Sequence, residues 1–315
     1  MSIVIADIIS EYGPYVNRGQ NKNKIKQLLF QTPETAAGMT SYQTENDIEE
    51  LGVGSLTEDF IQAFQQAWTP KGDITIVPNK LILDHIKIDM EVDPYKIVGS
   101  WLEFLRKGAL DPTKFPLIAY IVQEYVIPRI QSNIELKGIF KGKTGAITPG
   151  TATGALASMN GLKVKLIAGV KDTTMNKVAL GTLSASNIFE KVEEFASAIA
   201  EVYQGVPMEI NMSKNWEYLY KIDRRNTFNY PTQLDATVDG RLHTVKGLAS
   251  MAGEDIMFAT PKENKFYLYK DQTNQSVFQI EGSKRLVNLY TDFKLGTGFG
   301  INQAVWSYIP ESLLV

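Results

Sequence analysis

The chain has 315 residues, of which 44% are hydrophobic and 21% charged, and its formal net charge is −3. This is the composition of a folded protein with a full-sized core, and it excludes a disordered chain. It also gives no overall basic field that would attract nucleic acid or anionic lipid. Cysteine is absent and only two histidines occur, which excludes disulfides, thiolate metal sites, cysteine nucleophiles and a multi-histidine metal site within one chain.

The N-terminal stretch "MSIVIADIIS" has no basic segment and carries Asp7 inside its apolar run. A secretory signal peptide is therefore not expected. The longest apolar run, "PLIAYIV", is far shorter than the roughly 20 residues that cross a bilayer. We expect a soluble protein that is made in the cytoplasm and has no membrane partner.

Residues 1 to about 70 do not have the pattern of a compact domain. Polar and basic stretches such as "NRGQNKNKIKQ" alternate with short apolar patches, which predicts an extended arm that packs on something else. The basic cluster Arg18, Lys22, Lys24 and Lys26 could contact DNA. We favour a solvated arm or contacts with acidic protein neighbours, because such charge runs are usually solvated.

The stretch "GDITIVPNKLILDHIKIDMEVD" predicts a β-hairpin, since apolar and polar residues alternate on both sides of a turn signal. Pro78, Asn79 and Lys80 would form that turn. His85 and Lys87 fall on a mixed, charged face of the return strand. A polar contact across strands or between subunits is therefore favoured for His85 over a role as catalytic base.

Two helices follow, each with clear start and stop signals. Asp93 can cap the first, Pro94 suits its first turn and Gly108 suits its end. The second is a long helix over residues 115–140, on the order of 35 Å at 1.5 Å per residue. Pro128 lies inside it and is expected to bend or break it.

A loop after the long helix resembles a phosphate-binding motif. Gly138, Gly142, Lys143 and Thr144 nearly match the Walker A pattern, but only three residues separate the glycines instead of four. The loop also follows a helix instead of a strand. A flexible loop, "GKTGAITPGTATG", is favoured, and a nucleotide-binding enzyme that uses residues 138–144 stays as an alternative.

The remainder reads as a mixture of helices and strands. "LKVKLIAGV" predicts a strand, and "SNIFEKVEEFASAIAEVYQG" predicts an amphipathic helix capped by Ser186. "VPMEINMS" predicts a strand that ends at the cap Ser213, followed by a helix, "KNWEYLYKIDRRN". The last third is rich in strands, namely "RLHTVKGL", "DIMFATP", "KFYLYKD", "SVFQI", "RLVNLYTDFKLGTG" and "NQAVWSYI". The pattern predicts an α+β protein.

No group of residues indicates an enzyme. The carboxylate pair Glu193 and Glu194 lies on the polar face of a helix, where solvation is the default, and no G-x-S-x-G elbow occurs. His243 is a lone strand residue, which favours a structural role. "DRRN" at residues 223–226 could clamp a phosphate, but cations that end a helix are favoured. We therefore predict no catalytic residue, no cofactor and no metal.

One long stretch carries a resemblance to a known family. In "VPMEINMSKNWEYLYKIDRRNTFNY" a strand ending in Met212-Ser213 leads into a helix with Tyr220 and Arg224. In "VDGRLHTVKGLASMAGEDIMFATPKENKFYLYKD" two turns follow, formed by Gly247-Leu248 and by Ala259-Thr260-Pro261-Lys262-Glu263-Asn264. The stretch resembles the HK97-fold major capsid proteins of tailed bacteriophages. The order of elements extends the resemblance to nearly the whole chain, while the residue match covers about the last third.

The resemblance implies an α+β, HK97-like capsid fold with an N-terminal arm, an extended β-hairpin loop, a long spine helix in a peripheral domain and an α/β axial domain. The implied boundaries are 1–70 for the arm, 71–93 for the extended loop, 94–161 for the peripheral domain with its spine helix at 115–140, 162–265 for the axial domain and 266–315 for returning strands of the peripheral domain.

The resemblance also implies a function. The chain would be a major capsid protein that assembles in the host cytoplasm, as hexamers and pentamers, into the icosahedral head of a virion. That head would enclose double-stranded DNA without sequence-specific binding, with portal, scaffold and decoration proteins as partners. A cargo-enclosing nanocompartment shell is the alternative within this fold. The residues expected at contacts between subunits are Arg18, Lys22, Lys24, Lys26, Pro78, Asn79, Lys80, His85 and Lys87.

Overall fold

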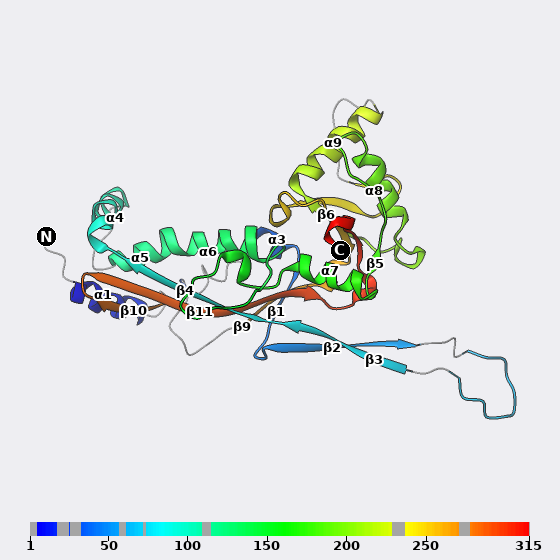
Figure 1. The fold of residues 1–315 in the computed structure, drawn as a ribbon, viewed down its shortest axis with the longest axis horizontal. Helices are drawn as coiled ribbons and strands as arrows, with labels where there is room; N and C mark the ends of the chain where they lie inside the picture. Colours follow the sequence, from blue (N-terminus) through cyan, green and yellow to red (C-terminus); the bar gives the residue numbers. More distant parts are fainter. Residues whose placement is uncertain are drawn as a thin grey trace.

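A computed structural model of the chain describes residues 5–17, 25, 33–56, 61–71, 74–108, 115–228, 237–270 and 278–314. Its described parts form an elongated lobe, a more compact lobe at one end of it, and a two-stranded ribbon that projects beyond both (Figure 1). We call these the long lobe, the compact lobe and the ribbon. The α+β class predicted from the sequence is confirmed.

The long lobe is built on a five-stranded sheet in the order β1-β9-β11-β10, with β4 also paired to β11. Its longest strand, β11, has fourteen residues; it pairs with β10 and β4 through its first part and with β9 through its last residues. The strand bounds are Thr40–Gln43 for β1, Asp84–Val92 for β4, Lys265–Lys270 for β9, Gln279–Ser283 for β10 and Leu286–Phe299 for β11.

A continuous helical run lies over this sheet and consists of α5 (Leu117–Ile121), η1 (Val122–Val126), α6 (Ile127–Asn133) and η2 (Ile134–Gly138). We call it the long helix. The expected break at Pro128 does not occur. Pro128 falls in the first turn of α6, directly after the π-helical turn η1, and a missing N–H costs least at such a position.

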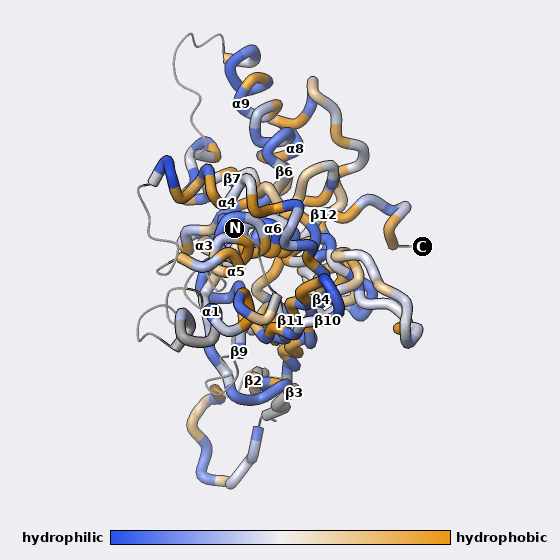
Figure 2. The backbone as a smooth tube through the Cα atoms, turned by 90° about the vertical axis from the view of Figure 1, so that its left-hand side faces the viewer, coloured by the Kyte–Doolittle hydropathy of each residue, from blue (hydrophilic) through white to orange (hydrophobic). Residues whose placement is uncertain are grey.

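The apolar face of the long helix and the facing side of the sheet form the core of the long lobe. Ile118, Val122 and Ile127 are among its buried helix residues, and Leu289 and Phe293 among its buried strand residues. Figure 2 shows the alternation of hydrophobic and hydrophilic positions along α8 and α9, which form a second core with the sheet of the compact lobe.

Helix α1 (Ile5–Asn17) packs on the long lobe of its own chain. Its side chains Ile8, Tyr12 and Tyr15 are buried, and Gln123 of the long helix donates a hydrogen bond from Nε2 to Tyr15 Oη at 2.7 Å. The expectation that this part of residues 1–70 lies extended is therefore wrong. The reason is local, because apolar residues spaced by four and three give a helix one buried face.

The compact lobe contains a second five-stranded sheet in the order β5-β12-β8-β6-β7. Helices α8 (Ile188–Ser197) and α9 (Lys214–Phe228) pack with it. The strand bounds are Asn176–Lys177 for β5, Glu209–Ser213 for β6, Thr244–Leu248 for β7, Met257–Thr260 for β8 and Trp306–Tyr308 for β12. The expected cap of α9 is confirmed, since Trp216 N donates to Ser213 Oγ at 3.3 Å.

Two local predictions in this region are wrong. "LKVKLIAGV" forms helix α7 (Leu162–Lys171) instead of a strand, because Leu162, Leu166 and Val170 recur every four residues and are buried on one face. Helix α8 begins after Asn187 instead of Ser186.

The ribbon is formed by β2 (Ile48–Leu56) and β3 (Ile74–Ile82) in antiparallel register. The predicted hairpin with a turn at Pro78, Asn79 and Lys80 is therefore wrong, because these residues lie inside β3 and pair with β2. The chain instead continues into β4, which pairs with β11. Proline is tolerated here since β3 belongs to a two-stranded sheet and has a free edge.

The remaining elements are short or peripheral. Helix α4 (Pro94–Gly108) has its predicted cap, since Tyr95 N donates to Asp93 Oδ1 at 3.1 Å. Helix α3 (Glu34–Ala37) precedes β1. The 3₁₀ turns are η3 (Ala155–Ala157), η4 (Glu201–Tyr203), η5 (Ala249–Met251), η6 (Lys262–Asn264), η7 (Asn302–Ala304) and η8 (Glu311–Leu313). Within the described ranges, no helix combines the length and apolar character that crossing a membrane requires.

Candidate assembly surfaces

The ribbon is anchored firmly at its base. Asn79 Nδ2 donates to Phe299 O at 2.6 Å and to Gly300 O at 3.2 Å, where β11 ends. Leu81 and Leu83 pack with Leu268 of β9 in a small buried cluster. The anchored base fixes the direction in which the ribbon leaves the body.

Glycines in β11 allow the ribbon base to approach this closely. A Cβ on Gly296 would lie 2.5 Å from Ile82 O, which is backbone, and a Cβ on Gly298 would lie 2.4 Å from Leu81 Cδ2. A larger residue at Gly296 would have to displace the strand, because a backbone atom cannot rotate out of the way.

The far end of the ribbon carries exposed apolar side chains. Residues 61–71, which we call the tip, are all exposed and belong to no helix or strand. Ile61 is 82% exposed, Phe64 94% and Trp68 91%. Large apolar side chains that are this exposed and this close together are typical of a surface that binds another molecule.

The nine residues expected at contacts between subunits do not form one surface. Pro78, Asn79 and Lys80 lie in the ribbon, and Lys80 Nζ lies 3.1 Å from Glu50 Oε1 on the neighbouring strand. His85 and Lys87 lie in β4, in the sheet of the long lobe. The basic cluster Arg18, Lys22, Lys24 and Lys26 lies outside the described residues.

The contacts of His85 and Lys87 are with their own chain. His85 Nε2 lies 3.9 Å from Asp292 Oδ1 across the sheet, and both side chains are about half exposed. Lys87 Nζ donates to Asp89 Oδ2 at 2.7 Å, and this hydrogen bond raises the pKa of Lys87. Both remain accessible to a neighbouring chain.

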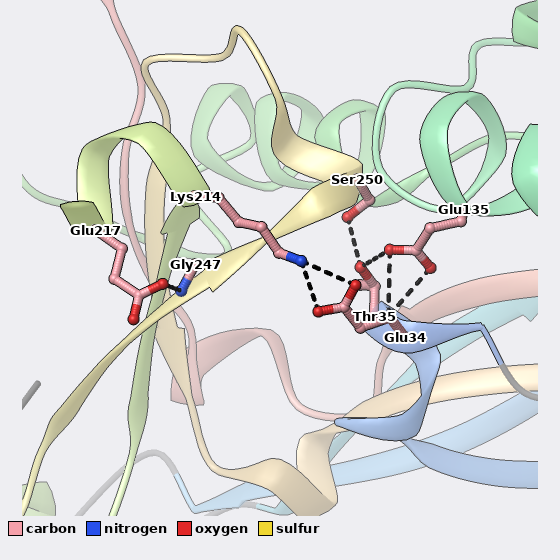
Figure 3. Close-up of polar contacts among 7 residues, drawn as sticks. All are labelled: Glu34, Thr35, Glu135, Lys214, Glu217, Gly247 and Ser250. Carbon is pink, nitrogen blue, oxygen red and sulfur yellow. Dashed lines mark hydrogen bonds and ion pairs between the residues drawn. The ribbon is translucent and has the colours of Figure 1, made fainter.

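A polar cluster joins the two lobes, as Figure 3 shows. Thr35 of α3 donates from its N–H to both carboxylate oxygens of Glu135, at 3.2 and 3.1 Å, and from its hydroxyl to Oε1. The hydroxyls of Thr35 and Ser250 lie 2.9 Å apart. Lys214 donates from Nζ to both carboxylate oxygens of Glu34, at 2.7 and 2.9 Å. We call these five residues the interlobe junction.

The interlobe junction links elements that are distant in sequence. Glu135 belongs to the long helix, Lys214 to the first turn of α9, and Ser250 to η5. Helix α3 therefore holds the long lobe and the compact lobe together. The Thr35 side is buried, and the Glu34 to Lys214 pair is half exposed, which leaves that pair weak.

A second ionic link lies between the sheets of the two lobes. Lys265 in β9 is only 3% exposed, and its Nζ lies 3.0 Å from Glu209 Oε2 in β6, while Lys246 Nζ lies 2.7 Å from Glu209 Oε1. Burial lowers the pKa of Lys265. Burial opposes ionisation of Glu209 too, but the hydrogen bond from Lys246 and the charge of Lys265 outweigh it and lower the pKa of Glu209.

The loop that resembles Walker A does not have the geometry of a phosphate site. Lys143 N donates to Leu156 O at 2.8 Å, and Thr144 N donates to Asn160 Oδ1 at 3.1 Å. These N–H groups are therefore spent within the protein. Gly142 is needed for packing, because a Cβ there would lie 2.4 Å from Met159 O.

The remaining polar candidates are also structural. Arg224 donates to Thr237 O at 3.0 Å and pairs with Asp239, so it does not stand ready to clamp a phosphate. His243 is fully buried without a hydrogen-bond partner for either ring nitrogen, and burial lowers its pKa. No three His, Asp or Glu side chains among the described residues lie where they could hold a metal.

The chain resembles solved capsid structures over nearly its full length. A chain of the satellite phage P4 procapsid including size determination (Sid) protein has 13% identity and a TM-score of 0.59; the match covers 97% of this chain and 98% of that chain. The capsid of Myoviridae phage XM1 has 11% identity and a TM-score of 0.50, with 87% and 90% covered. The chain has an HK97-like capsid fold.

At these identities the likeness establishes the capsid fold and not more. No protein-family model and no curated protein matches the sequence. Sequence reasoning identified the capsid fold but missed β2, because it assigned the partner of β3 to the strand after it. The signal was present, since "IEELGVGSL" has the length and content of a strand. Helix α3 and the interlobe junction gave no sequence signal.

Proposed function

We propose that the chain is a major capsid protein that assembles, as hexamers and pentamers, into the icosahedral head of a phage and encloses double-stranded DNA. The observation that carries the proposal is the ribbon, which leaves the body and ends in the exposed apolar tip. The capsid fold of the whole chain supports it.

The ribbon gains from neighbours of its own kind. A two-stranded hairpin is marginally stable in water, and ordering its backbone costs about 1–2 kcal/mol per residue. Covering a large apolar side chain contributes about 1.5–3 kcal/mol, and the tip offers three such side chains, Ile61, Phe64 and Trp68. Neighbouring copies in a shell would supply that cover and would also pair or shield the free ribbon edges.

In this proposal residues 94–161 and 266–315 form the peripheral domain, and residues 162–265 form the axial domain. The net charge of −3 is consistent with DNA that is packaged without sequence-specific binding. Portal, scaffold and decoration proteins are the proposed partners, and the virion is the proposed location.

Electron microscopy and light scattering of the purified chain test the proposal, first alone and then co-expressed with a scaffold protein. Shells, tubes or hexamers and pentamers are expected. A compact monomer under both conditions would contradict a shell function. The contents of the particles separate the two kinds of shell, because a phage head takes up DNA and a nanocompartment takes up a protein cargo.

A further inference from the structure

The tip has the sequence of an amphipathic helix. Ile61, Phe64 and Trp68 are spaced by three and four residues, which places all three on one face of an α-helix. Gln62, Gln65 and Gln66 fall between them and would face water. This is the binary pattern of a helix that buries one side.

The same stretch carries the signals that begin and end a helix. Thr57 is a suitable N-cap, and Glu58 and Asp59 would follow in the first turn, where negative charge is favourable. Pro70 comes directly after the pattern and would end it. The sequence therefore encodes a helix over residues 58–68.

Residues 61–71 do not form that helix in the isolated chain. Gln62 Nε2 donates to Thr69 O at 2.7 Å and Gln65 Nε2 donates to Thr69 Oγ1 at 2.6 Å, which closes the tip through its polar side chains. The apolar side chains are left in solvent. About eleven residues are too few for a stable helix in water unless one face is buried.

The long helix offers a matching surface. Tyr125 is 55% exposed and Leu136 44% exposed, and Pro128 between them is exposed as well. With the half-buried Ser132, these residues follow one face of the helix at spacings of three and four. We call Tyr125, Pro128, Ser132 and Leu136 the outer stripe, and none of the described elements covers its two large apolar side chains.

Charges at the two ends of these segments are complementary. The outer stripe begins beside Glu124 and ends beside Lys137, both exposed. The encoded tip helix begins with Glu58 and is followed by Lys71, which is the same number of residues apart. Each segment would span about 20 Å as a helix, so an antiparallel arrangement brings Glu58 to Lys137 and Lys71 to Glu124.

We propose that residues 58–68 fold into a helix against the outer stripe of a second copy of the chain, in antiparallel orientation. The inference rests on the proposed shell function and names the surface that receives the ribbon. The stripe of the same chain is out of reach, because the ribbon carries the tip away from the long helix (Figure 1).

The area involved indicates that the occupant is a second copy within a larger assembly. Three large side chains bury about 500 Å², whereas a stable pair of proteins buries about 1,200–2,000 Å². One tip would therefore not hold two proteins together. Repeated around a closed shell, the same contact adds to many others and becomes effective.

A matched pair of variants tests whether the tip binds as a helix. Gln65→Pro removes no apolar side chain but prevents the helix, whereas Gln65→Ala favours it. We expect Gln65→Pro to weaken each contact about 100-fold and to raise the concentration needed for assembly, while Gln65→Ala assembles at or below the concentration of the unmodified chain. Equal assembly of the two variants overturns the helix.

Disulfide trapping identifies the partner surface, and the natural absence of cysteine removes any background. Chains with Gln65→Cys are mixed with chains with Ser132→Cys and oxidised after assembly. We expect a disulfide between the two chains, and none when the second chain instead carries Glu190→Cys on α8. Particles without the expected disulfide overturn the receiving surface but leave the shell function intact. A chain that never assembles overturns both proposals together.

Discussion

The substitution Thr35→Val tests how much the interlobe junction contributes to stability. Valine has the shape of threonine, so packing around position 35 is retained while the hydroxyl is lost. That hydroxyl donates to Glu135 and lies 2.9 Å from the hydroxyl of Ser250. Thr35 is 2% exposed and Ser250 is fully buried, so water cannot replace the lost group.

The magnitude follows from these contacts. A hydrogen bond to a charged group contributes about 1.5–3 kcal/mol, and a buried hydroxyl that loses a partner costs about 1–3 kcal/mol. We expect Thr35→Val to lower the free energy of unfolding by about 2–4 kcal/mol. The backbone N–H of position 35 still donates to Glu135 in the variant, which keeps the loss below the sum of the two ranges.

Urea unfolding followed by tryptophan fluorescence measures the effect, and two controls separate its causes. Thr35→Ser keeps the hydroxyl and loses only a methyl group, at about 1 kcal/mol. Lys214→Ala removes the half-exposed pair with Glu34, which is expected to cost at most about 1 kcal/mol. If Thr35→Val is no less stable than Thr35→Ser, the buried hydroxyl does not hold the lobes together.

Three further predictions address the ribbon base, the buried histidine and the loop after the long helix. Gly296→Ala forces a Cβ against Ile82 O, so we expect it to destabilise the ribbon base by about 1–3 kcal/mol, visible as faster hydrogen exchange in β3; unchanged exchange would contradict the close approach. Burial keeps His243 neutral by lowering its pKa, so the unfolded chain takes up a proton that the folded chain refuses, and stability should fall as the pH drops below about 6.5; a variant His243→Phe should lose that part of the pH dependence, measured by urea unfolding at pH 5 and 8. Calorimetric titration with ATP should give no binding that Lys143→Ala abolishes, because the neighbouring N–H groups are already bonded; binding that this variant loses would restore the nucleotide hypothesis.

Elements with strong local signals were predictable from the sequence. Helix α4 has its cap at Asp93, and α9 has its cap at Ser213 directly after β6, as expected. The strands of the last third lie close to their predicted places. Caps, periodic apolar residues and turn residues act over a few positions, so they are readable without knowledge of the rest of the chain.

The sequence by itself determined the α+β class, these local elements and the capsid resemblance, which rests on the stretch around Met212 to Asn264. Tertiary structure decided which segments meet: β3 pairs with the earlier β2 instead of folding back at Pro78, α1 packs on its own lobe, and Thr35 reaches Glu135, 100 positions away. Pairing between distant segments depends on the complementarity of whole surfaces and on the entropy of closing the chain between them. Neither property is contained in a local stretch of residues.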